Sequence, residues 1–398
     1  QITELVQRIK RGALRSGATG PRHNLRQPLT TFFGREQELA LLKEQLAADD
    51  TRIVTLLGPG GIGKTRLAVE TGRQLAAHFR DGAYYVPVPE YRTAQGLAAG
   101  IAQALGFSSS RPRSSIDELA DFLANKQTLL IIDAAEHAQD AASLLETLIG
   151  LPGVKLLVTS RVRLHLPGEY ILEIQGLPYP QEQGNAHTPA SVEQTPAYRL
   201  FVDRYSRLQP RFRPTDEDRA AIARVCRLVA GMPLAIEMAA SWGRVLTCSE
   251  IAERIASFEP LAETLEERDQ GMQGVFSFSW QMLTVAEQQA ALRLSTFAGS
   301  FSRSAAEYVA ECPASTIMAL GDKSFLQWDV HGRFRIHEVI RGYLRRELAR
   351  DRGAEAAAFQ AHGDFFAGRL DSEPTKTIGQ ERVKELVDDL PNIQQAWR

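Results

Sequence analysis

The 398-residue sequence has few cysteines, no long apolar run and little excess charge. Its three cysteines, Cys226, Cys248 and Cys312, are far apart and lack the spacing of metal ligands. This excludes a disulfide framework and favours a reducing compartment, so a cytoplasmic location is expected. No segment resembles a signal peptide or a membrane span. With 46 basic and 48 acidic residues the net charge is −2, so no general attraction to nucleic acid is expected.

The composition is that of folded domains: 44% of the residues are hydrophobic and 24% are charged. A chain of this length is expected to form two to four packed units. It begins at Gln1 and stops at Arg398 within a helical pattern, which indicates a piece of a longer protein.

Short apolar runs alternate with helical patterns in the first half of the chain. The expected strands cover residues 53–57, 83–88, 129–132 and 154–159. Continuous apolar strands separated by helices are typical of a parallel sheet covered on both faces. The sequence therefore predicts an α/β domain with a parallel sheet.

The second half is helical, except for two strand-like pieces around His331-Gly332 that predict a hairpin. Helices followed by a hairpin indicate a winged helix. The predicted units are a linker or the end of an upstream region at 1–27, the α/β domain at 28–177, a helical domain at 178–262 with a linker at 178–196, a winged-helix domain at 263–350, and a further helical region at 351–398.

A glycine-rich segment follows the first predicted strand. Gly58-Pro59-Gly60-Gly61-Ile62-Gly63-Lys64-Thr65 matches the P-loop pattern at every fixed position. Glycines let successive N–H groups face a phosphate, and the following helix adds its positive end. We expect Lys64 to reach the β- and γ-phosphates of ATP or ADP, and Thr65 to be a ligand of Mg²⁺.

Two later strand ends supply the remaining candidates for chemistry. Asp133 ends a buried strand and is the expected second Mg²⁺ ligand, and Arg161 follows another strand, where it could sense a γ-phosphate. Lys64, Asp133 and Arg161 are thus the candidate catalytic residues. Ala134 stands where many fast ATPases have a second acid, and Glu136 is displaced from that position. Hydrolysis is therefore expected to be slow.

Further motifs give the chain a resemblance to a known family. Phe33-Gly34-Arg35-Glu36 resembles an entry motif that packs on adenine and ribose, and Gly231-Met232-Pro233-Leu234-Ala235 resembles the G-L-P-L-A motif. Arg335-Ile336-His337-Glu338 stands where the family has Met-His-Asp. Together with the P-loop they resemble the NB-ARC branch of the STAND signalling ATPases, including AfsR-like and LuxR-like bacterial regulators. The end of the chain resembles the first helices of a TPR-like sensor.

The resemblance implies a switch that closes on ADP, with Pro233 near the adenine and His337 at the β-phosphate. It also implies self-association after ATP exchange, an activating ligand on a C-terminal sensor, and an effector for transcription or defence. The candidate nucleotide-binding residues are Phe33, Gly34, Arg35, Gly58, Gly60, Gly61, Ile62, Gly63, Lys64, Thr65, Arg66, Pro233 and His337.

Two other functions stay open at this point. One is a conventional turnover ATPase, against which Ala134 argues. The other is a regulator that binds DNA through its own winged helix, with contacts from the final basic helix. Its candidate contacts are Arg341, Arg345, Arg346 and Arg350. We favour a solvated basic face balanced by acidic neighbours, and therefore expect no direct nucleic-acid binding.

Overall fold

The computed structural model describes residues 23–25, 27, 30–88, 93–107, 116–137, 141–181, 192–257, 275–328, 332–371 and 380–397. Much of the predicted linkers at 1–27 and 178–196, and His331 of the predicted hairpin, lie outside these residues. No helix within them is both long and apolar enough to cross a membrane.

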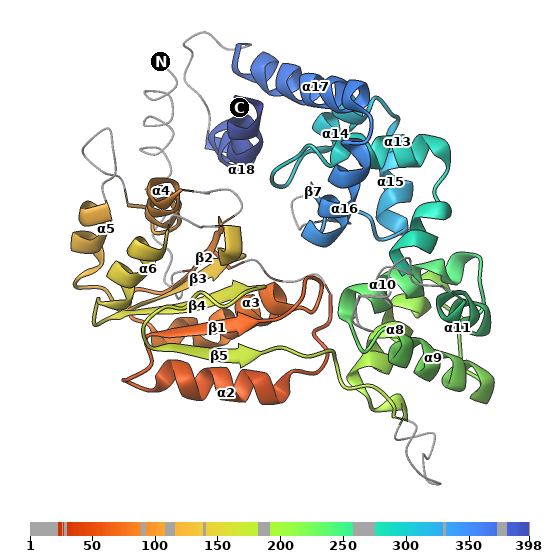
Figure 1. Cartoon of the computed structure of the whole chain (residues 1–398), viewed down its shortest axis with the longest axis horizontal. Coiled ribbons are helices and arrows are strands. Elements are labelled where there is room, and N and C mark those ends of the chain that lie inside the picture. Colours follow the sequence, from red (N-terminus) through yellow and green to blue (C-terminus); the bar gives the residue numbers. More distant parts are fainter. Residues whose placement is uncertain are drawn as a thin grey trace.

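Five parallel strands form the sheet of the first unit (Figure 1). They are β1 (Ile53–Leu57), β2 (Ala83–Pro87), β3 (Thr128–Asp133), β4 (Val154–Ser160) and β5 (Glu169–Glu173), in the spatial order β2-β3-β4-β1-β5. The first four confirm the predicted strands. The fifth was not predicted, because it is a partly buried edge strand whose apolar run of three residues lies between two glutamates.

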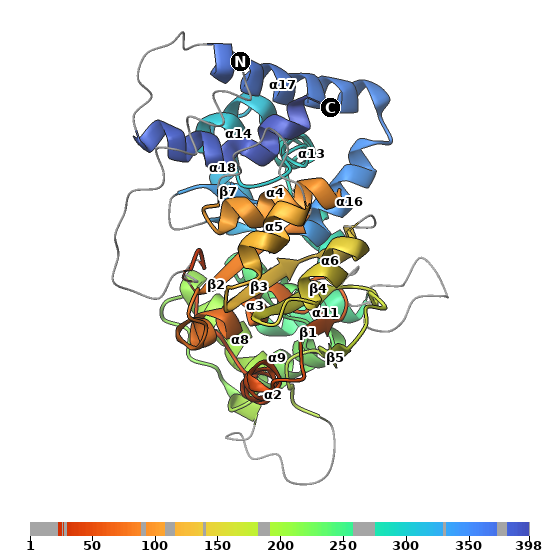
Figure 2. The ribbon, with the colours of Figure 1, turned by 90° about the vertical axis from the view of Figure 1, so that its left-hand side faces the viewer.

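Helices cover both faces of this sheet (Figure 2). One layer holds α2 (Glu36–Ala47) and α3 (Lys64–Leu75), and the other holds α4 (Ala94–Ala104), α5 (Ile116–Leu123) and α6 (Ala142–Ile149). Side chains of β3 alternate between the two cores: Leu129 and Ile131 pack with α3, and Leu130 and Ile132 pack with α4 to α6. This confirms the predicted α/β fold with a parallel sheet.

The described residues of the second unit form helices, as the sequence pattern predicted. They are α8 (Pro196–Leu208), α9 (Asp216–Leu228), α10 (Pro233–Ser241) and α11 (Cys248–Ala256), with α8 packed on α10 and α9 on α11. Capping boxes at Thr215 and Thr247 start α9 and α11. Pro233 starts α10, where its missing N–H costs nothing.

Within the described residues, the third unit contains the helical residues 275–281, three further helices, a hairpin and a last helix. Its elements are α13 (Val285–Leu294), α14 (Arg303–Ala310), α15 (Ala314–Asp322), β6 (Gln327–Trp328), β7 (Phe334–Arg335) and α16 (Glu338–Leu348). Strands β6 and β7 pair antiparallel, so the predicted hairpin is present. Two more helices, α17 (Arg352–Asp371) and α18 (Gln380–Ala396), pack on each other and on this unit. The boundaries of the domains and the TPR-like character of this end stay predictions.

Candidate functional site

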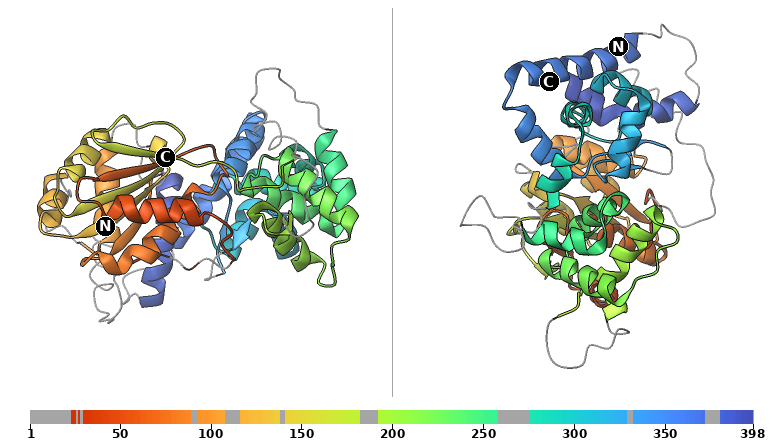
Figure 3. Two further views of the ribbon diagram at one scale, coloured as in Figure 1. Left: turned by 90° about the horizontal axis from the view of Figure 1, so that it is seen from below. Right: turned by 90° about the vertical axis from the view of Figure 1, so that its right-hand side faces the viewer.

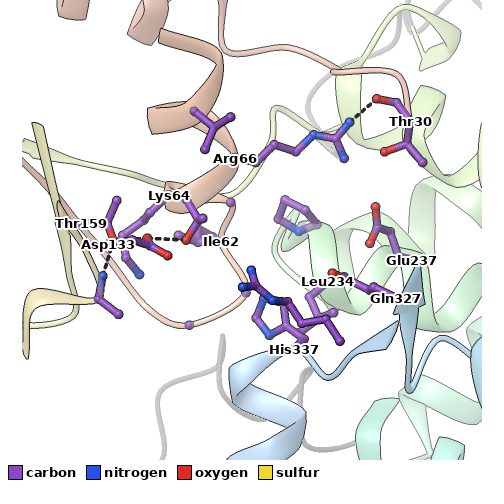
Figure 4. A pocket seen from close by; sticks show the side chains of 18 of the residues that line it. Thr30, Ile62, Lys64, Arg66, Asp133, Thr159, Leu234, Glu237, Gln327 and His337 are labelled. Atoms are coloured by element: carbon purple, nitrogen blue, oxygen red, sulfur yellow. Dashed lines mark hydrogen bonds between the residues drawn. The ribbon is translucent and has the colours of Figure 1, made fainter. Parts of the chain in front are cut away.

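A cavity of about 730 Å³ lies where the three units meet. Its walls come from the phosphate loop, the start of α10, the segment 297–301, the β6–β7 hairpin and the start of α16. In the left view of Figure 3 the α/β unit lies at the left of the molecule and helices α8 to α11, in green, lie at the right. Figure 4 shows the side chains of some of the residues that line the cavity. Eight lining residues are arginine or lysine and three are aspartate or glutamate. The cavity therefore suits an anionic ligand.

Three helix N-termini add to this positive character. Gly63 precedes α3 with a φ of 98°, Pro233 is the first residue of α10, and His337 caps α16. All three residues line the cavity. The N-terminal end of a helix carries partial positive charge and N–H donors, so the convergence of three such ends favours phosphate groups.

Asp133 lies at the centre of a network of hydroxyl groups. Its Oδ1 accepts hydrogen bonds from Thr65 Oγ1 (2.7 Å) and Thr159 Oγ1 (2.6 Å), and its Oδ2 accepts one from Tyr85 Oη (2.8 Å). Carboxylate and hydroxyl oxygens are the ligands that Mg²⁺ takes beside phosphate oxygens and water. The adjacent oxygens of Thr65 and Asp133 fit that ion. The sequence did not single out Tyr85, although it lies on the strand next to β3.

The phosphate loop is held by two cationic side chains. Lys64 Nζ donates to the carbonyl oxygens of Gly58 (2.6 Å) and Pro59 (3.0 Å). Arg35 is buried and donates to the carbonyl oxygens of Ile62 (3.1 Å) and Gln175 (2.6 Å). Arg35 thereby ties the entry motif to the phosphate loop and to the segment that leads to the helical unit.

Arg66 and Glu237 line the side of the cavity away from Asp133 (Figure 4). The Arg66 guanidinium donates to the carbonyl oxygens of Thr30 (2.5 Å) and Thr31 (2.6 Å), and burial lowers its pKa. Glu237 pairs with Arg204 at 2.9 Å. Because Phe33 and Pro233 also line the cavity, this side offers the apolar surface that a base needs.

The other two units contact the phosphate loop directly. The Leu234 N–H at the start of α10 lies 3.3 Å from the Gly61 carbonyl oxygen. Gly60 lies so close to α16 that an added Cβ would be 2.4 Å from Val339 Cγ2. That Cβ would also be 3.4 Å from the Arg161 guanidinium. Glycine is therefore the residue that permits this approach at position 60.

Thirteen of the predicted site residues line the cavity together: Phe33, Arg35, Gly60, Gly61, Ile62, Gly63, Lys64, Thr65, Arg66, Asp133, Arg161, Pro233 and His337. Gly34 and Gly58 do not line it. Gly34 lies against Pro196 at the start of α8, and the Gly58 N–H donates to the Ser160 carbonyl oxygen. We therefore interpret both as positions that shape the loops around the site. No pattern in the sequence pointed to the segment 297–301, which joins the wall only through tertiary folding.

The sequence of this chain is similar to those of several known proteins. Residues 47–173 match a family described as an AAA domain. The chain is 32% identical over 364 residues to a protein of Mycobacterium tuberculosis named as an HTH-type transcriptional regulator, a match that covers 87% of this chain and 39% of that protein. It is 30% identical over 349 residues to the regulatory protein AfsR of Streptomyces griseus, covering 80% of this chain and 32% of AfsR. The chain thus spans about two fifths or less of these relatives.

A solved structure shares the fold. It is a STAND protein with a tetratricopeptide repeat sensor from Pyrococcus horikoshii, with a TM-score of 0.56 and 16% sequence identity. The similarity covers 94% of this chain and 49% of that protein. At this identity the comparison shows the fold alone.

Proposed function

We propose that this P-loop chain, which is similar in sequence to the AfsR regulators and shares the fold of a STAND protein, is a nucleotide-controlled switch that closes around ADP. One observation carries the proposal: residues of all three units line a single cationic cavity around the phosphate loop. A ligand in that cavity would contact all three units and so favour the arrangement in which they meet.

Such a ligand can supply enough binding free energy to hold the closed form. A ligand that binds only the closed form stabilises it by about 4 kcal/mol when its concentration is a thousand times its dissociation constant. The two conformations of a protein that switches commonly differ in free energy by a few kcal/mol. The loop touches the other units at Gly60 and Gly61, and a nucleotide in the cavity would add its own contacts to these.

His337 would hold the β-phosphate from the third unit. Its Nδ1 accepts a hydrogen bond from the Val339 N–H at 3.2 Å, so the neutral ring carries its proton on Nε2. That N–H is the donor that an anionic oxygen requires. Thr65 and Asp133 would hold Mg²⁺, which neutralises phosphate charge when it is bound.

Exchange of ADP for ATP would then open the molecule. Loss of the His337 contact would free the third unit, and the open form would self-associate and activate an effector for transcription or defence. An activating ligand bound at the C-terminal helices would favour this opening. Hydrolysis would be slow, because Ala134 offers no carboxylate to orient water, and it would serve to reset the switch.

The nucleotide content of the purified protein tests the proposal. The protein is denatured, the supernatant is chromatographed, and bound ADP is expected. Small-angle scattering should show a larger radius of gyration with ATP than with ADP. Absence of adenine nucleotide, together with no uptake of added ADP, would refute the switch. A steady-state turnover well above about one per second, typical of ordinary enzymes, would favour a conventional ATPase instead.

The basic helix α16 gives little support to direct DNA binding. Arg341 donates to the carbonyl oxygens of Phe297 and Ala298, and Arg345 donates to those of Ser295 and Thr296. These two guanidinium groups therefore bind the protein's own backbone. A salt-dependent mobility shift of DNA by this chain would show the opposite.

A further inference from the structure

Glu136 and Arg161 form an ion pair at the phosphate end of the cavity. The Arg161 Nε lies 3.3 Å from Glu136 Oε1, and the Arg161 backbone N–H donates to Glu136 Oε2 at 3.3 Å. Both residues line the cavity. The Glu136 side chain is only 13% exposed, whereas that of Arg161 is 40% exposed. The carboxylate is thus fixed in place, and the guanidinium has room to move.

The turn after β3 brings Glu136 to this place. Ala134 has a φ of 59°, a left-handed conformation that is uncommon for alanine, and its N–H donates to Thr159 Oγ1 at 2.9 Å. The chain then forms the short helix Ala135–His137, which places Glu136 beside the end of β4. Strained backbone of this kind is kept where the surrounding structure requires it, commonly at functional sites.

The Arg161 guanidinium also lies beside the phosphate loop, as its approach to Gly60 shows. The other two acids that line the cavity have different partners: Asp133 accepts hydrogen bonds from three hydroxyl groups, and Glu237 pairs with Arg204. Among the lining acids, Glu136 is therefore the acid that pairs with the arginine next to the phosphate loop.

We propose that Glu136 sets the preference of this cavity for ADP over ATP by competing with a third phosphate for Arg161. A diphosphate can bind without disturbing the ion pair. A triphosphate brings further negative charge toward the Glu136 carboxylate and must draw Arg161 away from it. This inference rests on the proposed function, since it concerns which nucleotide the same cavity prefers.

The variant Glu136→Gln tests this directly. Glutamine keeps the shape and the oxygen that accepts the Arg161 backbone N–H, but it removes the charge. Affinities for ADP and ATP are measured by competition against a fluorescent ADP analogue. We expect ATP affinity to rise relative to ADP affinity by about 1.4- to 5-fold, the range for exposed charge pairs. Glu173→Gln is the matched control, because it removes the acid of another arginine pair, Arg163–Glu173 at 3.7 Å, that does not line the cavity, and it should leave the ratio unchanged.

A second pair of variants tests whether Arg161 is the mediator. In an Arg161→Gln background, adding Glu136→Gln should change the ATP-to-ADP ratio much less than it does in the unsubstituted protein. An effect of undiminished size would overturn the role of Arg161. An unchanged ratio in Glu136→Gln, with both nucleotides still bound, would overturn this inference alone. Failure of the unsubstituted protein to bind any adenine nucleotide would instead overturn the proposed function.

Discussion

The contact between Gly60 and Val339 allows the closed arrangement to be perturbed at one atom. Alanine at position 60 places a Cβ 2.4 Å from Val339 Cγ2, whereas carbon atoms in contact are normally about 3.5–4.0 Å apart. The Val339 side chain, or the unit that carries it, must therefore shift by about 1 Å. Gly60 is absent from the glycines with positive φ, so the loop backbone itself accepts alanine.

The magnitude follows from the cost of overpacking. Inserting a methyl group into a packed contact costs about 1–3 kcal/mol, which lowers the ratio of closed to open protein by about 5- to 150-fold. We expect Gly60→Ala to release ADP faster and to have a larger radius of gyration in the presence of ADP. Stopped-flow dissociation of a fluorescent ADP analogue and small-angle scattering measure the two effects.

A second substitution separates this clash from damage to the phosphate loop. Val339→Ala removes Cγ2 and keeps a good helix former in α16, so the double variant should regain the ADP dissociation rate and the radius of Val339→Ala. The reasoning is refuted if Gly60→Ala behaves like the unsubstituted protein. It is refuted equally if Val339→Ala fails to compensate, because the defect would then lie in the loop.

Substitutions at four further positions have defined outcomes. His337→Ala should weaken ADP binding and favour oligomers in sedimentation. His337→Asn should have the same effects while keeping the helix cap. Unchanged ADP affinity and unchanged mass in solution would show that His337 has only a structural role. Tyr85→Phe removes the hydrogen bond to Asp133 Oδ2, so Mg²⁺-dependent nucleotide affinity should fall by about 0.5–1.5 kcal/mol with no change in the absence of Mg²⁺. Asn392→Ala removes the fully buried amide that binds the backbone of Ala298, Gly299 and Ser300, of which the first two line the cavity. The free energy of unfolding should fall by about 1–3 kcal/mol, and ADP should dissociate faster. An unchanged rate of ADP dissociation would show that α18 does not influence the cavity. Burial lowers the pKa of His362 to about 4, so the unfolded form binds the proton first as pH falls. This one group should therefore lower the free energy of unfolding by up to about 1.4 kcal/mol per pH unit from pH 6.5 toward 4, and His362→Phe should remove that contribution in urea titrations.

The sequence by itself determined the local features of this protein. The fixed positions of the phosphate loop, the apolar run before Asp133 and the helix signal at Pro233 each depend on a few neighbouring residues, because turns, strands and caps are local structures. That is why four of the five strands, the helices between them and the helical character of the second unit were predicted. The edge strand β5 was not, since its residues are partly exposed and its apolar run is short.

Only the tertiary structure decided which distant residues share the cavity. The pairing of Glu136 with Arg161 depends on two parallel strands ending at the same edge, and the contact of Gly60 with Val339 depends on how the third unit packs. The segment 297–301 enters the wall because side chains of α16 and α18 bind its backbone. Such contacts join residues far apart in the chain, and no local pattern encodes them. The sequence predicted the phosphate site, whereas the fold showed that three units meet around it.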